Sequence, residues 1–296
     1  MQLRLQHIQG MLQLKHTDSA DKYIKLWRNC QTFCTNCTTG HDNTSARVTK
    51  KKIELLLTMP MSHRDATRIE EDTRMQGKCL SWYQQRCGRI TGSIVSRVVK
   101  CKSLGSAARL ASNIAQAPLV LYENQHRKTC AMRHGTEHEE AVRRHYVDHQ
   151  SLRHMNFLSR DAGLFICEKF QCVAASPDGI IKCSCCGRGV FAIKCPYKYK
   201  DTHADDNNDK GFYHENGRLK ENHEYMFQVQ TEMVSADVSY CDFVCWTSKS
   251  FVVVRVLRDT DFIEKHMPVL RGFLKHALLP QLLSRKSINE VQCNDA

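Results

Sequence analysis

Two short apolar segments separated by a glycine- and cysteine-rich turn place the strongest constraint on the fold. Residues 163–183 read GLFICEKFQCVAASPDGIIKC, and residues 189–196 read GVFAIKCP. Short apolar or aromatic runs that are interrupted by Gly, Pro, Ser and Asp are typical of β-strands. We therefore predict strands here, with the carboxylate of Asp178 and the ammonium of Lys194 at adjoining strand ends.

The apolar patterns before and after these strands predict several helices and one hairpin. Residues 104–116 carry apolar side chains at spacings of three and four, and residues 136–148 follow a similar pattern with Thr136 as the expected N-cap. We also predict a helix near 222–235, a hairpin formed by CDFVCW and SFVVVRVL, and a last helix from about Thr260. Helices followed by mixed strands with an inserted helix predict an α+β fold, in which helices cover one mixed sheet.

The first 77 residues differ from the rest in being polar and weakly periodic. We expect a loosely structured extension over 1–77 and one folded domain over 78–296. The formal net charge of +12 favours a polyanionic partner such as nucleic acid. The first residues lack the continuous apolar run of a secretory signal, and no segment has the roughly 18 to 20 apolar residues that span a bilayer. We therefore expect an intracellular protein, nuclear if eukaryotic, with no membrane partner.

The Asp178 and Lys194 pair suggests a site for a hard cation. Mg²⁺ prefers oxygen ligands and usually combines one or two carboxylates with substrate phosphate and water, and a nearby lysine can orient the attacking water. Hydrolysis of a phosphodiester is the natural use of such a site. The structural alternative is a hairpin with a Pro-Asp-Gly turn and a solvated lysine.

Five motifs in a fixed order give the chain a family resemblance. They are RCGRITGS at 86–93, HGTEHEEA at 134–141, ASPDGIIKCSCCGRGVFAIKCPY at 175–197, ENHEYMFQVQTEM at 221–233 and CDFVCWT at 241–247. Together they resemble the YqaJ-type viral recombinases, which are relatives of the lambda-type exonuclease within the restriction-endonuclease-like, PD-(D/E)xK superfamily of nucleases. The resemblance extends from about Trp82 to the last helix.

The resemblance implies a restriction-endonuclease-like mixed sheet and a Mg²⁺- or Mn²⁺-dependent exonuclease that acts in DNA recombination and repair. It implies linear duplex DNA ends as the partner, with a homo-oligomer and a single-strand annealing protein as further candidates. By motif position, Asp178, Glu139 and the Ile193 carbonyl would bind metal, while Lys194 and Gln228 would act on the attacking water. The remaining matches, which would receive the terminal phosphate of DNA, are Arg86, Ser93 and Ser176.

One position departs from the family pattern. The second acidic residue, two before the lysine, is Ala192, so the chain reads Ala-Ile-Lys where Glu-x-Lys is expected. A methyl group cannot coordinate a metal, and this leaves three hypotheses. Another carboxylate could supply the ligand, with Glu140, Glu168 and Glu224 as candidates. The chain could instead be a catalytically inactive DNA-binding remnant of a viral or mobile element. An RNA or nucleotide hydrolase on the same site is the third.

Cysteine clusters raise the question of zinc. The sixteen cysteines, without a secretory signal, predict reduced thiols or metal ligands. Four residues in the first 77, Cys30, Cys34, Cys37 and His41, offer three thiolates and one imidazole for a tetrahedral zinc, although scattered thiols are the simpler interpretation. We interpret the second cluster, Cys183, Cys185 and Cys186, as part of a tight glycine-rich turn.

Overall fold

A computed structural model of the chain describes residues 61–123, 128–204, 214–215 and 218–282. Its centre is a five-stranded mixed sheet in the order β10-β9-β6-β5-β2. Strands β6 and β9 run parallel, and the other neighbours are antiparallel. The strands are β2 (Leu158–Arg160), β5 (Gly179–Cys183), β6 (Gly187–Lys194), β9 (Tyr240–Trp246) and β10 (Phe251–Leu257).

Smaller β-elements accompany this sheet. A second sheet has the order β1-β4-β3, with β1 parallel to β4, and a two-stranded ribbon pairs β7 with β8. These strands are β1 (Ile90–Thr91), β3 (Phe165–Ile166), β4 (Val173–Ala175), β7 (His214–Glu215) and β8 (Arg218–Leu219).

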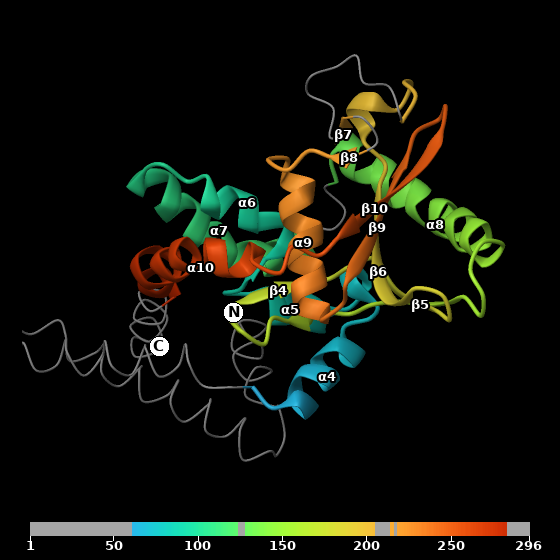
Figure 1. Cartoon of the computed structure of the whole chain (residues 1–296). Coiled ribbons are helices and arrows are strands. Elements are labelled where there is room, and N and C mark those ends of the chain that lie inside the picture. Colours follow the sequence, from blue (N-terminus) through green and yellow to red (C-terminus); the bar gives the residue numbers. More distant parts are fainter. Residues whose placement is uncertain (1–60, 124–127, 205–213, 216–217, 283–296) are drawn as a thin grey trace, which may run out of the picture.

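Two helices cover the opposite faces of the large sheet (Figure 1). Side chains of a strand alternate between faces, so Ala192 of β6 packs in one cluster with Val229 of α9 (Glu224–Ala236). Phe191 and its neighbours on the other face pack against Tyr146 of α8 (Cys130–Ser151). Helices α8 and α9 both extend to the end of the sheet where Asp178 directly precedes β5.

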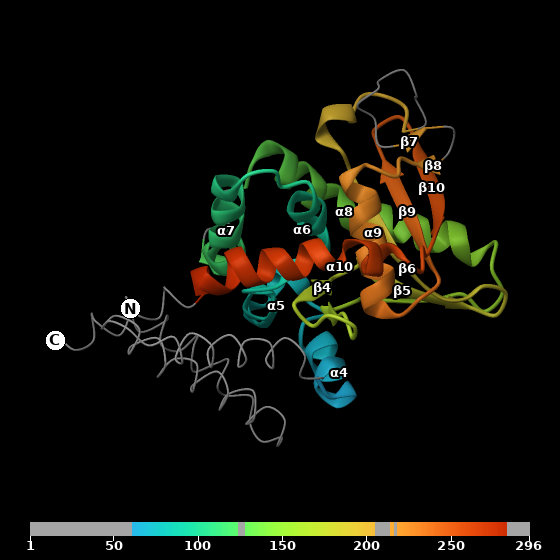
Figure 2. The same ribbon diagram turned by 60° about the vertical axis from the view of Figure 1, so that its left-hand side comes forward.

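The remaining helices form a second layer next to α9 (Figure 2). They bury a continuous apolar cluster that also contains Phe227 of α9. The elements that contribute to this cluster are α6 (Gly92–Val99), α7 (Leu104–Glu123), α10 (Phe262–Phe273) and the π-helical turn η4 (Leu274–Leu278). Helix α5 (Leu80–Arg86) packs against α7. A short 3₁₀ turn, η3 (Tyr197–Tyr199), follows β6.

Residues 61–78 are part of the packed structure. Helix α4 (His63–Asp72) is followed by the 3₁₀ turn η2 (Gln76–Lys78). The buried Glu70 of α4 accepts a hydrogen bond from the Gly163 amide at 3.1 Å, and Thr73 Oγ1 accepts one from the Leu164 amide at 2.7 Å. For 61–77 the structure therefore differs from the expected loose extension, because these contacts fix α4 to the segment that leads into β3.

The expected α+β architecture, a mixed sheet flanked by helices, is confirmed. The expected cap of α8 is wrong, because the helix begins earlier: Thr129 accepts from the Met132 amide, whereas Thr136 Oγ1 donates to the Met132 carbonyl. Within the described segments, no helix is long and apolar enough to cross a membrane. The proposed zinc ligands Cys30, Cys34, Cys37 and His41 lie outside the described residues.

Candidate functional site: a carboxylate and lysine cluster at the sheet end

Asp178 lies at the entrance to β5 and is fixed by β6. Its amide donates to the Phe191 carbonyl at 3.0 Å, and its Oδ2 accepts from the Ile193 amide at 2.5 Å. Gly179 permits this close approach, because a Cβ there would lie 2.3 Å from the Phe191 ring. The Asp178 carboxylate is thus held next to the end of β6, as the sequence predicts.

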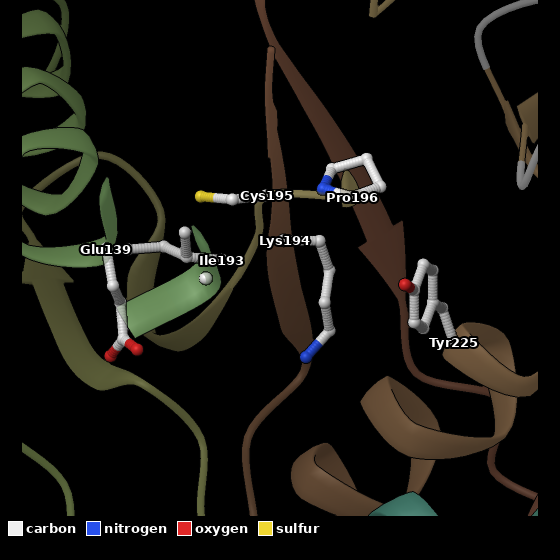
Figure 3. A pocket seen from close by; sticks show the side chains of 7 residues that line it. Glu139, Ile193, Lys194, Cys195, Pro196 and Tyr225 are labelled. Carbon is white, nitrogen blue, oxygen red and sulfur yellow. The ribbon is translucent and has the colours of Figure 1, made fainter. Parts of the chain in front are cut away.

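Glu139 reaches the same place from α8. It lines one pocket with Ile193 and Lys194, and Figure 3 shows the Glu139 carboxylate and the Lys194 ammonium directed the same way from α8 and β6. Burial and the nearby Asp178 charge raise the pKa of Glu139. Arg143, one turn later on α8, donates to the Asp178 carbonyl and lies 3.5 Å from Glu139 Oε1, so it connects the two acidic residues.

Lys194 is held in its protonated form. Burial lowers its pKa, but the charges of Asp178, Glu232 and Glu139 outweigh burial and raise the pKa above its ordinary value. The ammonium also lies 5.5 Å from the ring centre of Tyr225 on α9. At neutral pH this side chain can therefore donate hydrogen bonds and offset negative charge, but it cannot accept a proton.

Glu232 on α9 is an acidic residue of this cluster that the sequence reasoning missed. It is 1% exposed, and its Oε1 accepts from Gln228 Nε2 at 2.7 Å. Its Oε2 is buried and has no hydrogen-bond partner within the described part of the chain. Burial, together with Asp178, raises the pKa of Glu232 to about 8, although Lys194 and Gln228 lower it. A buried carboxyl oxygen without a partner is costly unless a ligand satisfies it.

The three carboxylates proposed to replace the missing acidic residue do not join the cluster. Glu140 is exposed and lies 3.7 Å from both Arg143 and Arg144. Glu168 lies in an exposed turn after β3, and Glu224 is an exposed residue in the first turn of α9. Glu140, Glu168 and Glu224 are all exposed, whereas Glu232 is buried.

The position of Glu232 has a simple geometric basis. Ala192 and Lys194 point to the α9 face of β6, and Ala192 is completely buried against that helix. Residues four apart lie on one helix face, so Gln228 and Glu232 project together. The sequence signal was therefore present: Gln228-x3-Glu232 places a carboxylate one turn beyond the glutamine that the family resemblance had already singled out.

A second polar cluster contains the predicted phosphate-binding residues. Arg86 Nη2 donates to Thr91 Oγ1 at 3.4 Å, and Thr91 Oγ1 lies 3.4 Å from Ser93 Oγ. Ser176 Oγ accepts from Trp82 Nε1 at 2.8 Å, and the Arg86 guanidinium lies 4.1 Å from the centre of the Trp82 ring. The structure therefore brings Arg86, Ser93 and Ser176 together, and adds Thr91 and Trp82.

The two clusters adjoin each other through α9 and the β1-β4 pair. Ser176 precedes Asp178 by two residues, and the pairing of Thr91 with Ala174 brings the start of α6 beside β4. A Cβ on Gly92 would lie 3.4 Å from the Gln228 carbonyl and 3.5 Å from Ala175. A polymeric ligand that binds Arg86 through an anionic group would therefore extend past the carboxylate cluster.

The chemistry of the donor set suits a divalent cation. The carboxyl groups of Asp178, Glu139 and Glu232 all interact electrostatically with Lys194. The ligand atoms that they could provide to a metal are all oxygen atoms. Hard cations such as Mg²⁺ prefer carboxylate, carbonyl and water oxygens. The unpartnered Glu232 Oε2 is consistent with such a ligand.

Residues 81–239, more than half of the chain, match the model of the YqaJ-like viral recombinase domain. A search of curated proteins finds no significant match. Among solved structures, an alkaline exonuclease (LHK-Exo) from Laribacter hongkongensis is 21% identical, with 73% of this chain and 99% of that chain covered, at a TM-score of 0.49.

Two further solved structures support the fold. LHK-Exo in complex with dAMP is 21% identical over the same shares of the two chains, at a TM-score of 0.50. A SOX–DNA complex is 11% identical over 74% of this chain and 72% of that chain, at a TM-score of 0.51. At these identities the likeness concerns the arrangement of helices and strands.

Proposed function

Because the chain belongs to the YqaJ-like viral recombinase domain family, we propose that it is a divalent-metal-dependent deoxyribonuclease that digests linear duplex DNA from its ends. One observation carries this proposal. Three carboxylates from three different elements, Asp178, Glu139 and Glu232, converge with Lys194 at one end of the sheet. The alkaline exonuclease and the DNA complex among the similar structures are consistent with this function.

The metal would be Mg²⁺ or Mn²⁺, held by Asp178, Glu139 and the carbonyl of Ile193. When bound, such an ion activates a water molecule and offsets the charge that develops on the phosphate. Asp178 suits a central role because the backbone of β6 fixes its carboxylate. Arg143 would keep Glu139 on the side of Asp178.

Glu232 would take the place of the acidic residue that Ala192 lacks. Ala192 packs in one buried cluster with Val229 and Met233 of α9, and Glu232 lies directly before Met233 in that helix. The unpartnered Oε2 gives Glu232 the free ligand atom that this role requires. On this proposal Ala192 does not imply an inactive enzyme, because the carboxylate has moved from the strand to the helix.

Lys194 and Gln228 would position the attacking water. Lys194 remains an ammonium, so it would orient the water and offset charge without acting as the base. Gln228 already donates one amide hydrogen to Glu232, and its carbonyl oxygen could accept from the water. Arg86, with Ser93 and Ser176, would receive the terminal phosphate of the DNA end, because a guanidinium flanked by hydroxyls suits phosphate.

A carboxylate-transfer experiment tests the proposal. The substrate is an end-labelled, 5′-phosphorylated linear duplex with Mg²⁺ or Mn²⁺, followed over time. We expect the unmodified protein to digest it, and Asp178→Asn and Glu232→Ala to lose at least 100-fold in rate. The double variant Ala192→Glu with Glu232→Ala returns a carboxylate from the strand side and should recover part of that loss. The matched control is Glu224→Gln on the exposed start of the same helix, which should retain the full rate.

Metal binding provides a readout that does not depend on turnover. Titration of Mn²⁺, monitored by electron paramagnetic resonance, should give at least tenfold weaker binding for Glu232→Gln than for the unmodified protein or Glu224→Gln. Unchanged Mn²⁺ binding in Glu232→Gln would contradict the role of Glu232.

The alternative function, a DNA-binding remnant, has one observation in its favour, which is Ala192 itself. It predicts binding of duplex ends without digestion by the unmodified protein, with digestion appearing only after Ala192→Glu. Preferential digestion of RNA over duplex DNA would instead favour a ribonuclease. A protein that neither binds nor cuts any of these substrates would refute the proposed function.

A further inference from the structure

The turn between β5 and β6 lies at the far end of these strands from the carboxylate cluster, and it gathers three cysteines. Cys183 ends β5, and Cys185 and Cys186 follow in the turn. Gly187, with φ of 75°, adopts the left-handed conformation that allows β6 to start at once. The sequence favoured a plain glycine-rich turn here, and the structure has this turn, with all three sulfur atoms close together.

A histidine from a distant segment completes the group. His154 lies beyond the end of α8, and its Nδ1 is 3.1 Å from Cys185 Sγ, 3.6 Å from Cys186 Sγ and 3.7 Å from Cys183 Sγ. The sulfur of Cys185 is 3.4 Å from that of Cys183 and 3.8 Å from that of Cys186. All four ligand atoms lie within 4.8 Å of one another.

These separations match the edges of a tetrahedron around zinc. With Zn–S bonds of about 2.3 Å and Zn–N bonds of about 2.0 Å, tetrahedral angles separate two sulfur atoms by about 3.8 Å and sulfur from nitrogen by about 3.5 Å. The five distances given above, from 3.1 to 3.8 Å, are close to these values. A disulfide would require about 2.05 Å between sulfur atoms, and Cys185 lies much farther than this from both Cys183 and Cys186.

The surroundings suit three thiolates. Arg255 Nη1 donates to Cys186 Sγ at 3.2 Å, and the Cys186 amide donates to Cys183 Sγ at 3.3 Å. Three thiolates and one neutral imidazole around Zn²⁺ carry one net negative charge, which the Arg255 guanidinium offsets. Hydrogen bonds to ligand atoms commonly orient them and tune the metal.

We propose that His154, Cys183, Cys185 and Cys186 form a structural zinc site. Four protein ligands leave no open position for substrate, which is the pattern of structural and not of catalytic zinc. The site joins the end of α8 to the β5-β6 hairpin, where the Ser184 amide also donates to the Met155 carbonyl at 2.8 Å. Because α8 carries Glu139 and the hairpin strands carry Asp178 and Lys194, the zinc fixes two elements of the carboxylate cluster relative to each other.

The first test is the metal content of the full chain, purified after expression with added zinc. Elemental analysis should show that the double variant His154→Ala with Cys185→Ser contains one equivalent of zinc less than the unmodified protein. Cys130→Ser, an exposed cysteine outside the cluster, is the matched control and should keep the full content. Cys34→Ser separates any contribution of the N-terminal cysteines. An equal zinc content in the double variant and the unmodified protein would overturn the proposal.

Cobalt substitution tests the ligand set by its absorption spectrum, first in the unmodified protein. The Co²⁺ form should show the absorption bands of tetrahedral cobalt and a sulfur-to-cobalt charge-transfer band. Cys185→His keeps four ligands, so it should retain the metal and lose about one third of the charge-transfer intensity.

Chemical protection tests the unmodified protein directly. Iodoacetamide should label the exposed Cys185 slowly in the zinc-loaded chain and at least tenfold faster after chelation, as measured by mass spectrometry of the peptide that contains it. Equal labelling with and without chelator, or a Cys185 disulfide found in that peptide, would refute zinc ligation.

Discussion

Arg86 is a half-buried cation that has no carboxylate partner among the described residues. Burial lowers its pKa to about 10, so it keeps its charge at neutral pH while its contacts are to Trp82 and Thr91. Such a group favours an anionic ligand, because a buried charge is costly until it is paired. The charge of Arg86, together with the adjoining hydroxyls of Ser93 and Ser176, therefore favours the terminal phosphate as the proposed ligand.

We expect Arg86→Ala to reduce the preference for 5′-phosphorylated over 5′-hydroxyl duplex ends by about 10- to 100-fold, the equivalent of one charge-assisted contact of about 1.5 to 3 kcal/mol. The rates on both ends are measured side by side. Arg97→Ala removes the same charge from an exposed position on α6 and should leave the preference unchanged. An equal loss on both kinds of end in Arg86→Ala would show that the residue does not recognise the phosphate.

Glu70 gives the fold a pH dependence. Burial raises its pKa, but hydrogen bonds from Arg74, Arg160 and the Gly163 amide outweigh burial, so the pKa lies below its ordinary value of 4.5. A carboxyl with a lowered pKa in the folded state stabilises the protein above pH 4.5. That stabilisation is lost as the pH falls through the folded-state pKa.

We therefore expect Glu70→Gln to lower the free energy of unfolding by about 2 to 4 kcal/mol at pH 7, with a smaller difference from the unmodified protein below pH 4.5. Urea unfolding at pH 7, 5.5 and 4 measures this. Glu71→Gln, an exposed neighbour whose carboxylate lies 3.8 Å from Arg74, should cost less than about 1 kcal/mol. A pH-independent difference for Glu70→Gln would rule out its ionisation as the cause.

At the scale of elements, α8 shows how a cap decides where a functional helix begins. Thr129 accepts from the Met132 amide at 3.2 Å and thereby starts the helix seven residues before Thr136, the cap expected from the sequence. The two additional turns bring Gly135 to the pocket lined by Glu139. Both threonines precede acceptable helix sequence, so only the helix geometry distinguishes them.

We expect Thr129→Ala to lower the free energy of unfolding by about 0.5 to 2 kcal/mol, the usual cost of losing an N-cap. Thr136→Ala is the matched control and should be nearly neutral, because an exposed alanine is a good helix former. Urea unfolding monitored by circular dichroism compares them. A larger effect of Thr136→Ala than of Thr129→Ala would contradict the assigned helix start.

At the scale of the whole molecule, the sheet joins two distant sites. On the α8 side, the buried Asp242 of β9 accepts from Tyr146 at 2.8 Å and from Arg255 Nε at 2.7 Å. Arg255 continues to Cys186 in the cysteine turn. On the α9 side, Ala192 and Val229 pack together beneath Lys194 and Glu232. Helices on opposite faces therefore meet at one end of the sheet in the carboxylate cluster, and α8 meets the hairpin at the other end.

The local elements can be predicted from the sequence alone. The paired strands around Asp178 and Lys194, the helix that carries Gln228 and the β9-β10 hairpin all follow from side-chain periodicity and turn residues, which act over a few positions. The motif order also gave the family, because Asp178, Glu139, Lys194 and Arg86 keep the order and spacing of the family motifs. These features depend on neighbours along the chain, so they can be read without coordinates.

Which side chains meet in space depends on how these elements pack. Glu232 joined the cluster because α9 packs on the face of β6 that carries Ala192 and Lys194. His154 lies beside Cys183, which is 29 residues later in the sequence, because the segment after α8 packs against the β5-β6 hairpin. Such contacts depend on helix packing angles and burial, which no periodicity within one segment specifies. The sequence therefore identified where a carboxylate is missing, and the fold identified Glu232 as the buried carboxyl group near that position.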